Sequence, residues 1–176
     1  MLDESNFIWI ISCKWRKVGN SGMEMLTGEF KVTLDEKGRI SLPAHLRRIL
    51  DNANLTITQC KDSCLWLFPT DEYTDLLKEI QDSTNPLIRD DRGIRRRIFN
   101  SHPVEIDKAG RIPIAISMRE FAGLSKECIV LGQGDYIEIW DEDRYSKYLT
   151  ESEEDYISAA EKLGNHLKNN KDSNIQ

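Results

Sequence analysis

The chain has little of what most enzymes and metal proteins need. It contains only three histidines and four cysteines among 176 residues. No second cysteine pair or histidine cluster joins Cys60 and Cys64 to complete a zinc site. No Ser/His/Asp or Cys/His set has a spacing typical of catalysis, and no glycine-rich phosphate loop is present. The sequence therefore predicts neither an enzyme nor a metal or other cofactor.

Long hydrophobic runs are also missing. The apolar stretch from Phe7 to Cys13 is far too short to span a bilayer. It follows the acidic residues Asp3 and Glu4, where a signal peptide needs positive charge. We therefore expect a cytoplasmic protein that neither enters a membrane nor is exported. Such a location favours reduced thiols at Cys60 and Cys64, with a disulfide as the alternative.

A net positive charge is absent too. The formal net charge of -6 at pH 7 does not by itself indicate a nucleic-acid-binding protein. The charges are nevertheless uneven: residues 85–111 hold seven basic and four acidic residues, whereas residues 141–155 hold seven acidic and two basic ones. The run Arg95–Arg97 therefore has two interpretations, a nucleic-acid patch or a partner for the acids of a neighbouring subunit. Opposite charges on one chain favour the second.

What the sequence does have is a motif that occurs twice. Asp35–Ile40 reads DEKGRI, and Asp107–Ile112 reads DKAGRI, 72 positions later. In each copy an apolar residue precedes the aspartate, a glycine suits the positive φ of a tight turn, and alternating apolar residues follow the arginine. A repeat this regular indicates one structural unit built twice.

The elements predicted around the two copies follow the same order. In the first half we expect strands at 29–34 and 39–42, a helix at 44–50, a hairpin of 55–58 with 65–68, and a helix at 70–81. In the second half we expect strands at 103–106 and 111–114, a helix at 116–122 ended by a glycine, strands at 128–131 and 136–140, and a helix from 141. A helical segment from about residue 85 links them.

Neither half is large enough to bury a core alone. We therefore predict a mixed, β-rich α/β fold in which the two halves form one pseudo-two-fold barrel unit with peripheral helices. The predicted parts are an N-terminal extension (1–24), the first half (25–81), a helical linker (82–100), the second half (101–150), and a polar, weakly amphipathic tail (151–176) that frays at its end.

The sequence resembles the MraZ family over roughly residues 25–148. The likeness rests on both motifs and on three further segments, namely MLTGEF at 25–30, VLGQ at 130–133 and IWD at 139–141. It implies tandem AbrB-like (SpoVT-AbrB-type) swapped-hairpin domains and a ring-shaped homo-oligomer. It also implies a bacterial, nucleoid-associated transcriptional regulator of the division and cell-wall gene cluster that binds direct repeats upstream of its own gene.

The resemblance places contacts to double-stranded DNA on the two motifs. The DNA-binding residues that it implies are Lys37, Gly38, Arg39, Lys108 and Arg111, and the motif-orienting residues are Asp35 and Asp107. The residue pattern alone also allows an Asp35–Arg39 pair that merely fixes the turn, and both roles are compatible if the aspartate orients the arginine.

The two copies differ in sequence. Ala109 replaces Lys37, and no proline stands at the position equivalent to Pro43. We therefore expect unequal contributions, with Arg39 and Lys37 as the main DNA contacts. The exposed Lys37 is a better candidate for phosphate than for base contact.

Two other classes of function stay open. One is a ring-forming scaffold or interaction protein whose DNA binding is incidental. The other is an AbrB-like antitoxin, although such chains usually carry one motif and a toxin-binding tail. A gel shift on the gene's own upstream region, with and without Lys37 and Arg39, separates them.

Residues 1–24 precede the resemblance. They are either an extension of the protein or, as we predict, untranslated leader DNA read as protein. The family's operators are direct repeats with a TGG-type core, and Trp15 is encoded only by TGG. Val18-Gly19 and Ser21-Gly22 can hold TGG about ten and about twenty bases further on, or about one helical turn per repeat. Such direct repeats suit head-to-tail neighbours in a ring better than a two-fold dimer.

The nucleotide sequence of the gene tests this interpretation. We expect GTG as the codon for Val18 and AGT or TCT as the codon for Ser21, because only these place TGG in the required frame. Any other codon at either position refutes the leader interpretation.

Overall fold

The computed structural model describes residues 25–51 and 53–172, with side chains up to residue 164. The predicted leader, residues 1–24, lies outside the described residues. The chain divides into two compact units, one ending at Asp141 and the other beginning at Glu142. No helix within the described ranges is long and apolar enough to cross a membrane.

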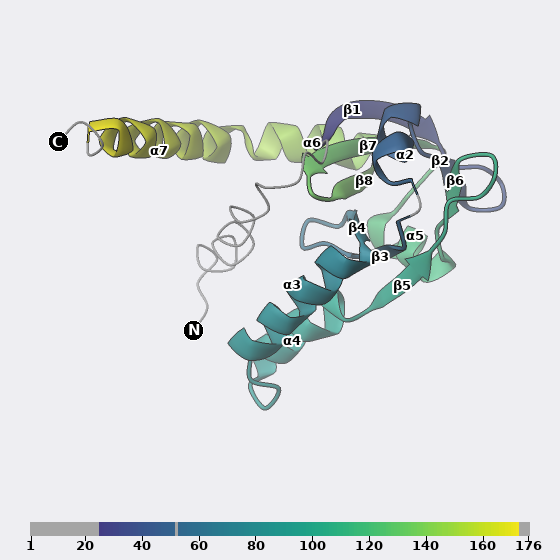
Figure 1. The fold of residues 1–176 in the computed structure, drawn as a ribbon, viewed down its shortest axis with the longest axis horizontal. Coiled ribbons are helices and arrows are strands. Elements are labelled where there is room, and N and C mark those ends of the chain that lie inside the picture. The colour runs from purple at the N-terminus through teal and green to yellow at the C-terminus, as the bar shows by residue number, and fades with distance from the viewer. Residues whose placement is uncertain (1–24, 52, 173–176) are drawn as a thin grey trace. The chain divides into compact units, whose positions relative to one another are not determined.

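The elements follow the predicted order (Figure 1). Those of the first half are β1 (Leu26–Thr33), β2 (Arg39–Ser41), α2 (Ala44–Ile49), β3 (Leu55–Gln59), β4 (Leu65–Pro69) and α3 (Thr70–Ser83). After α4 (Arg89–Ile98) come β5 (Ser101–Val104), β6 (Arg111–Pro113), α5 (Ile116–Ala122), β7 (Glu127–Gly134) and β8 (Ile137–Asp141). The second unit consists of α6 (Glu142–Glu151) and α7 (Glu153–Asp172).

The strand order reflects the sequence repeat. The larger sheet has the antiparallel order β1-β7-β8-β4-β3-β5, and the smaller one pairs β2 with β6. Replacing each strand by its repeat equivalent (β1 by β5, β3 by β7, β4 by β8, and the reverse) gives the same order read from the opposite end of the sheet. The first strand of each half therefore pairs with the other half, β1 with β7 and β5 with β3. This arrangement is the pseudo-two-fold unit that the repeat predicts.

Two residue pairs locate the pseudo-two-fold axis. Ile40 faces Ile112 in the small sheet, and Trp66 faces Glu138 at the centre of the large one. Each residue is 72 positions from its partner and so faces its own repeat equivalent. The axis therefore passes between β2 and β6 and between β4 and β8. The Glu138 carboxylate accepts hydrogen bonds from the indole N–H groups of Trp66 (3.3 Å) and Trp140 (2.9 Å).

The predicted barrel is not found. Strands β1 and β5 lie at opposite ends of the six-stranded order, and the separate β2–β6 sheet meets the larger one at the isolated bridge between Leu34 and Ile40, so no closed barrel is found among the described residues. Each first strand pairs with the other half, and β4 and β8 meet at the centre. This long-range pairing explains why β1 and β7 are longer than predicted, since Leu26 pairs with Gly134.

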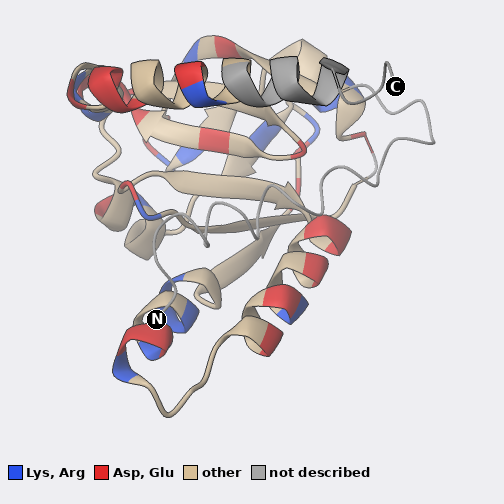
Figure 2. Cartoon of the chain, turned by 90° about the vertical axis from the view of Figure 1, so that its left-hand side faces the viewer, with Lys and Arg blue, Asp and Glu red and all other residues tan. Residues whose placement is uncertain are grey.

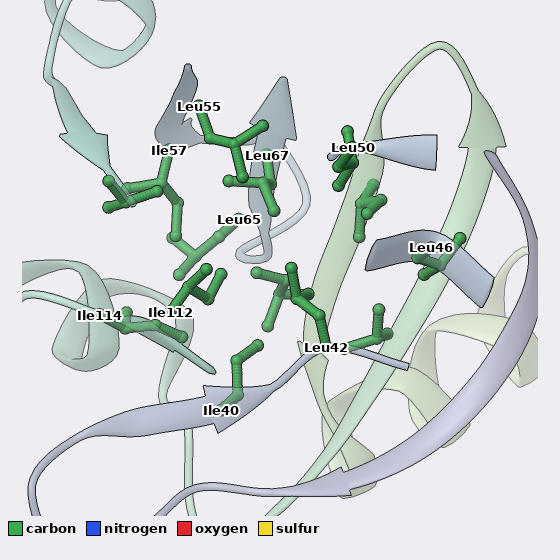
Figure 3. Close-up of a cluster of buried hydrophobic side chains, with 14 of the residues drawn as sticks. Ile40, Leu42, Leu46, Leu50, Leu55, Ile57, Leu65, Leu67, Ile112 and Ile114 are labelled. Atoms are coloured by element: carbon green, nitrogen blue, oxygen red, sulfur yellow. The ribbon is translucent and has the colours of Figure 1, made fainter. Parts of the chain in front are cut away.

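One hydrophobic core joins the halves (Figure 3). Ile40 and Ile112 of the small sheet are fully buried, as are Leu46 of α2 and Met118 of α5. They pack in one cluster with apolar residues of the large sheet, among them Leu55, Ile57, Leu65, Leu67, Val130, Ile137 and Ile139. The small sheet contains three residues per strand and depends on this burial for its stability.

We expect Ile112→Ala to lower the free energy of unfolding by about 2–5 kcal/mol, because it leaves a cavity on the axis where both halves meet. The matched control is Ile116→Ala at the start of α5, where the side chain is 64% exposed and a change within about 0.5 kcal/mol is expected. Urea unfolding of both variants gives the comparison. Equal losses at the two positions would contradict the proposed joint core.

Candidate nucleic-acid interface

The aspartate of the first motif holds its own turn together. The Oδ1 atom of Asp35 accepts hydrogen bonds from the backbone N–H groups of Lys37 and Arg39, each at 2.9 Å. The backbone N–H of Gly38 donates to the Asp35 carbonyl at 2.8 Å, and Gly38 has a φ of 73°. Glycine suits this turn because a side chain at such a φ is strained.

The same carboxylate also fixes the arginine. The Oδ2 atom of Asp35 accepts from Nε of Arg39 at 2.8 Å and lies 2.7 Å from its Nη2. Two charge-assisted contacts of this kind hold a guanidinium in one orientation. The predicted Asp35–Arg39 pair is therefore present.

The second motif has nearly the same geometry. Asp107 Oδ1 accepts from the backbone N–H groups of Ala109 (2.9 Å) and Arg111 (3.0 Å), and its Oδ2 lies 2.9 Å from both Nε and Nη2 of Arg111. Gly110 has a φ of 78°. The second motif has Ala109 where the first has Lys37, and this difference leaves the turn geometry unchanged.

The missing proline has no structural effect either. Pro43 precedes α2 with φ -55° and ψ 142°, and Ala115 precedes α5 with φ -57° and ψ 147°. The two backbones follow the same path into the helix. The sequence differences thus change the side chains at the turns and leave their backbone conformation intact.

The fold brings the two motifs into one cluster. Nη1 of Arg39 lies 3.9 Å from Oδ2 of Asp107, and Nη1 of Arg111 lies 3.8 Å from Oδ2 of Asp35. Each carboxylate therefore faces both arginines. The four side chains are 26–34% exposed, so the cluster lies at the surface with solvent access.

Backbone hydrogen bonds tie each turn to the opposite half. The Gly38 carbonyl accepts from the N–H of Ile114 at 2.8 Å, and the Gly110 carbonyl accepts from the N–H of Leu42 at 3.0 Å. Both acceptors are the glycines of the motifs. Each turn is consequently positioned by residues that follow the other turn's strand.

The predicted DNA-binding residues fall into two groups. Arg39, Arg111, Lys37 and Lys108 are accessible, the two lysines being exposed at the tips of the turns. Gly38 is buried, as is its equivalent Gly110. The glycines therefore shape the turns, and the cations face solvent.

Sequence reasoning missed two arginines that cover these glycines. Arg119 of α5 lies against Gly38, and Arg47 of α2 lies against Gly110, so closely that a Cβ at either glycine would collide with the guanidinium. The Nε atoms of both are buried without a hydrogen-bond partner among the described residues. The signal was available, because Arg47 and Arg119 are also 72 positions apart.

Within the two turns and the two arginines that cover them, cations outnumber anions. The two turns, together with Arg47 and Arg119, contain six cations (Lys37, Arg39, Arg47, Lys108, Arg111, Arg119) and three anions (Asp35, Glu36, Asp107). The first turn carries Glu36 beside Lys37, whereas the second carries Lys108 at the position of Glu36. Each turn thus presents one lysine, so Ala109 does not leave the second turn without a lysine.

The three cysteines of the described residues do not form a competing site. Cys60, Cys64 and Cys128 are buried free thiols. Burial raises the pKa of Cys64 far above the ordinary thiol value and that of Cys128 to about 12, which disfavours the reactive thiolate. Within residues 25–51 and 53–172, no group of three or more His, Cys, Asp or Glu side chains is placed to hold a metal ion.

Comparison with known proteins gives consistent matches. A family model described as "MraZ protein, putative antitoxin-like" matches residues 25–92 and 98–166. A Treponema denticola protein named Transcriptional regulator MraZ is 46% identical over 140 residues, which is 79% of this chain and 97% of the relative. Proteins of the same name from Treponema pallidum and Saccharopolyspora erythraea are 40% and 37% identical, over 78% and 79% of this chain and 93% and 96% of the relatives.

The pKa values of the two motif aspartates test the geometry. Hydrogen bonds from Arg39 and Arg111 hold the pKa values of Asp35 and Asp107 below the usual 3.8. Their ionised forms therefore stabilise the fold above about pH 3.8, and this contribution is lost as the pH falls through the lowered native pKa values. We expect carboxyl-detected NMR titration to show both shifts.

Arg39→Gln supplies the control within the same spectra. It should raise the pKa of Asp35 toward 3.8 and move Asp107 less, because Arg39 is 2.7 Å from the first carboxylate and 3.9 Å from the second. Burial raises the pKa of Asp135, which should stay unchanged in this variant. An unchanged Asp35 titration would contradict the paired geometry.

Proposed function

This chain belongs to the MraZ family of transcriptional regulators, and from that premise we propose that it binds double-stranded DNA through its two joined Asp-x-x-x-Arg turns. The family is not an enzyme family. The observation that supports the proposal best is the single surface cluster in which each arginine is held by its own aspartate and faces the aspartate of the other motif. We infer a cytoplasmic, nucleoid-associated protein with double-stranded DNA as its partner.

The hydrogen bonds leave part of each arginine available. Asp35 engages Nε and Nη2 of Arg39, whereas the 3.9 Å contact of Nη1 with Asp107 is longer than a hydrogen bond. Arg111 has the same arrangement, with its Nη1 3.8 Å from Asp35. Each Nη1 group keeps its N–H donors for the O6 and N7 acceptors of guanine or for phosphate. Arginines held in advance lose less conformational entropy when they bind.

The surrounding cations contribute attraction without sequence preference. Lys37 and Lys108 project at the tips of the two turns, where we assign them phosphate contacts. Arg47 and Arg119 add two further cations beside the turn glycines. This local excess permits DNA binding by a chain whose net charge is -6.

We propose that several protomers act together. In this proposal the chain forms a ring, and neighbouring protomers bind the direct repeats upstream of its own gene, in the division and cell-wall cluster. Binding by one protomer would be weak and binding by several strong. Affinity should fall steeply with salt, since several phosphates are contacted at once. A scaffold with incidental DNA binding would show no preference for the upstream repeats.

Replacing either motif arginine should lower both the affinity and the sequence preference of DNA binding. We expect Arg39→Gln or Arg111→Gln to lower the affinity for the upstream repeats by about 10–100-fold and to reduce the preference over competitor DNA, because each removes a base-edge donor. Lys37→Gln should weaken binding to both DNAs alike and reduce the salt slope. Fluorescence anisotropy across a range of salt concentrations measures these quantities.

Lys78→Gln is the charge-matched control. Lys78 lies exposed on α3, where it pairs with Asp75 at 2.9 Å, so its loss should leave DNA binding unchanged. A folded Arg39→Gln protein with unaltered DNA affinity and sequence preference would refute the assignment of Arg39 as a DNA contact. Equal wild-type affinity for repeats and competitor would favour the scaffold.

A further inference from the structure

The basic run Arg95–Arg97 does not act as one patch. Nη1 of Arg95 donates to the hydroxyl of Thr84 at 3.0 Å, and its guanidinium lies 5.0 Å from the centre of the Phe99 ring. Arg97 lies over Phe121 at 5.9 Å. Two of the three arginines are thus used inside the chain.

A different set of arginines forms an exposed stripe on α4. Arg89, Arg92 and Arg96 are exposed, and their spacing of three and four residues places them on one side of the helix. No ion pair joins any of them to a carboxylate within residues 25–51 and 53–141. Leu87, Ile88 and Phe99, which are 86%, 50% and 40% exposed, lie at the two ends of this basic stripe.

The basic stripe lies on a helix that is fastened at its C-terminal end. Ile98 is buried, and its carbonyl accepts hydrogen bonds from the hydroxyls of Thr58, at 2.9 Å, and Tyr73. Helices α3 and α4 lie side by side and extend away from the sheets (Figure 1). Figure 2 shows blue cations gathered on α4 and red acids along α3. The stripe is therefore held on a fixed, projecting element.

Helix α7 offers a complementary stripe. Every residue from Glu153 to Leu163 is exposed, including Tyr156 (73%), Ile157 (52%) and Leu163 (59%). Over residues 153–163 the helix therefore has no packed face among the described side chains, and a segment of this kind is stabilised by a partner. Glu154, Ile157 and Glu161 share one side, and these three positions define its acidic stripe.

The two stripes match in spacing. Arg89 and Arg96 are seven residues apart, as are Glu154 and Glu161, which corresponds to about 10 Å along each helix. In a parallel arrangement the three positions coincide: each end arginine meets a glutamate, and Ile157 packs on the stem of Arg92 between them. Charge, apolar exposure and spacing thus agree.

We propose that the basic stripe of α4 binds the acidic stripe of α7 in a second copy of this chain. This contact repeats from copy to copy, since every chain carries both stripes. The inference deepens the self-association proposed above and names its surfaces. It requires no DNA contact by α4.

Charge reversal with reciprocal mixing tests the contact. Arg89→Glu/Arg96→Glu and Glu154→Arg/Glu161→Arg each create like charges across the contact and should weaken self-association at least about 100-fold. Light scattering after size-exclusion chromatography, without DNA, should then give single-chain masses. Mixing the two variants should restore the wild-type mass, because each stripe now meets its opposite on the other chain. Circular dichroism checks that all proteins fold.

Controls and contrary outcomes are equally specific. Asp155→Arg reverses a charge on another side of α7 and should leave assembly intact. The proposal is overturned by a monomeric wild type, by a reversed variant that assembles normally, or by a mixture that does not recover. If Arg89→Glu/Arg96→Glu assembles normally but binds DNA more weakly by fluorescence anisotropy, the basic stripe contacts DNA instead. Assembly is measured without DNA. An overturned α4–α7 contact would therefore leave the proposed DNA binding by Arg39 and Arg111 standing, and anisotropy measures that binding separately.

Discussion

The structure depends on a reciprocal fit in which each motif turn is completed by the other half. The carbonyl of each motif glycine accepts a hydrogen bond from a residue just after the other half's short strand, and those strands pair across the pseudo-two-fold axis. A three-residue strand pair has little stability alone, so the fully buried Ile40 and Ile112 must hold it against the core. The local geometry of each turn comes from its own aspartate, whereas its position depends on both halves being folded.

Apolar residues and charged residues therefore have different roles in this arrangement. The ion pairs of the cluster are partly exposed, and pairs of that kind contribute little to stability. Their contribution is orientation: each carboxylate bonds its own turn with one oxygen and faces both arginines with the other. The apolar core fixes where the turns lie, and the aspartates fix where the arginines point.

The sequence predicted what local chemistry determines. The turn glycines, the order of the elements and Gly123 at the end of α5, where φ is 60°, all follow from local signals. The pairing of β1 with β7 does not, because it joins residues a hundred positions apart. The predicted barrel is not confirmed, because the strand pairing of the described residues forms two sheets and no closed barrel.

The site shows the same division. The Asp35–Arg39 pair was predictable from its four-residue spacing, whereas the contacts between motifs require the fold. Arg47 and Arg119 share the offset of 72, but their contacts with the turn glycines appear only in the fold. Adjacent arginines also looked like one patch, although α4 directs Arg95 and Arg97 toward internal partners.

The central claim is that the two turns bind DNA as one unit. A double-mutant cycle tests it most directly, with the affinity of Arg39→Gln, Arg111→Gln and the double variant measured for the upstream repeats. Because each arginine faces the other's aspartate, the double variant should differ from the sum of the single effects by at least about 0.5 kcal/mol. Strictly additive losses would contradict the claim and show that the two turns bind DNA independently.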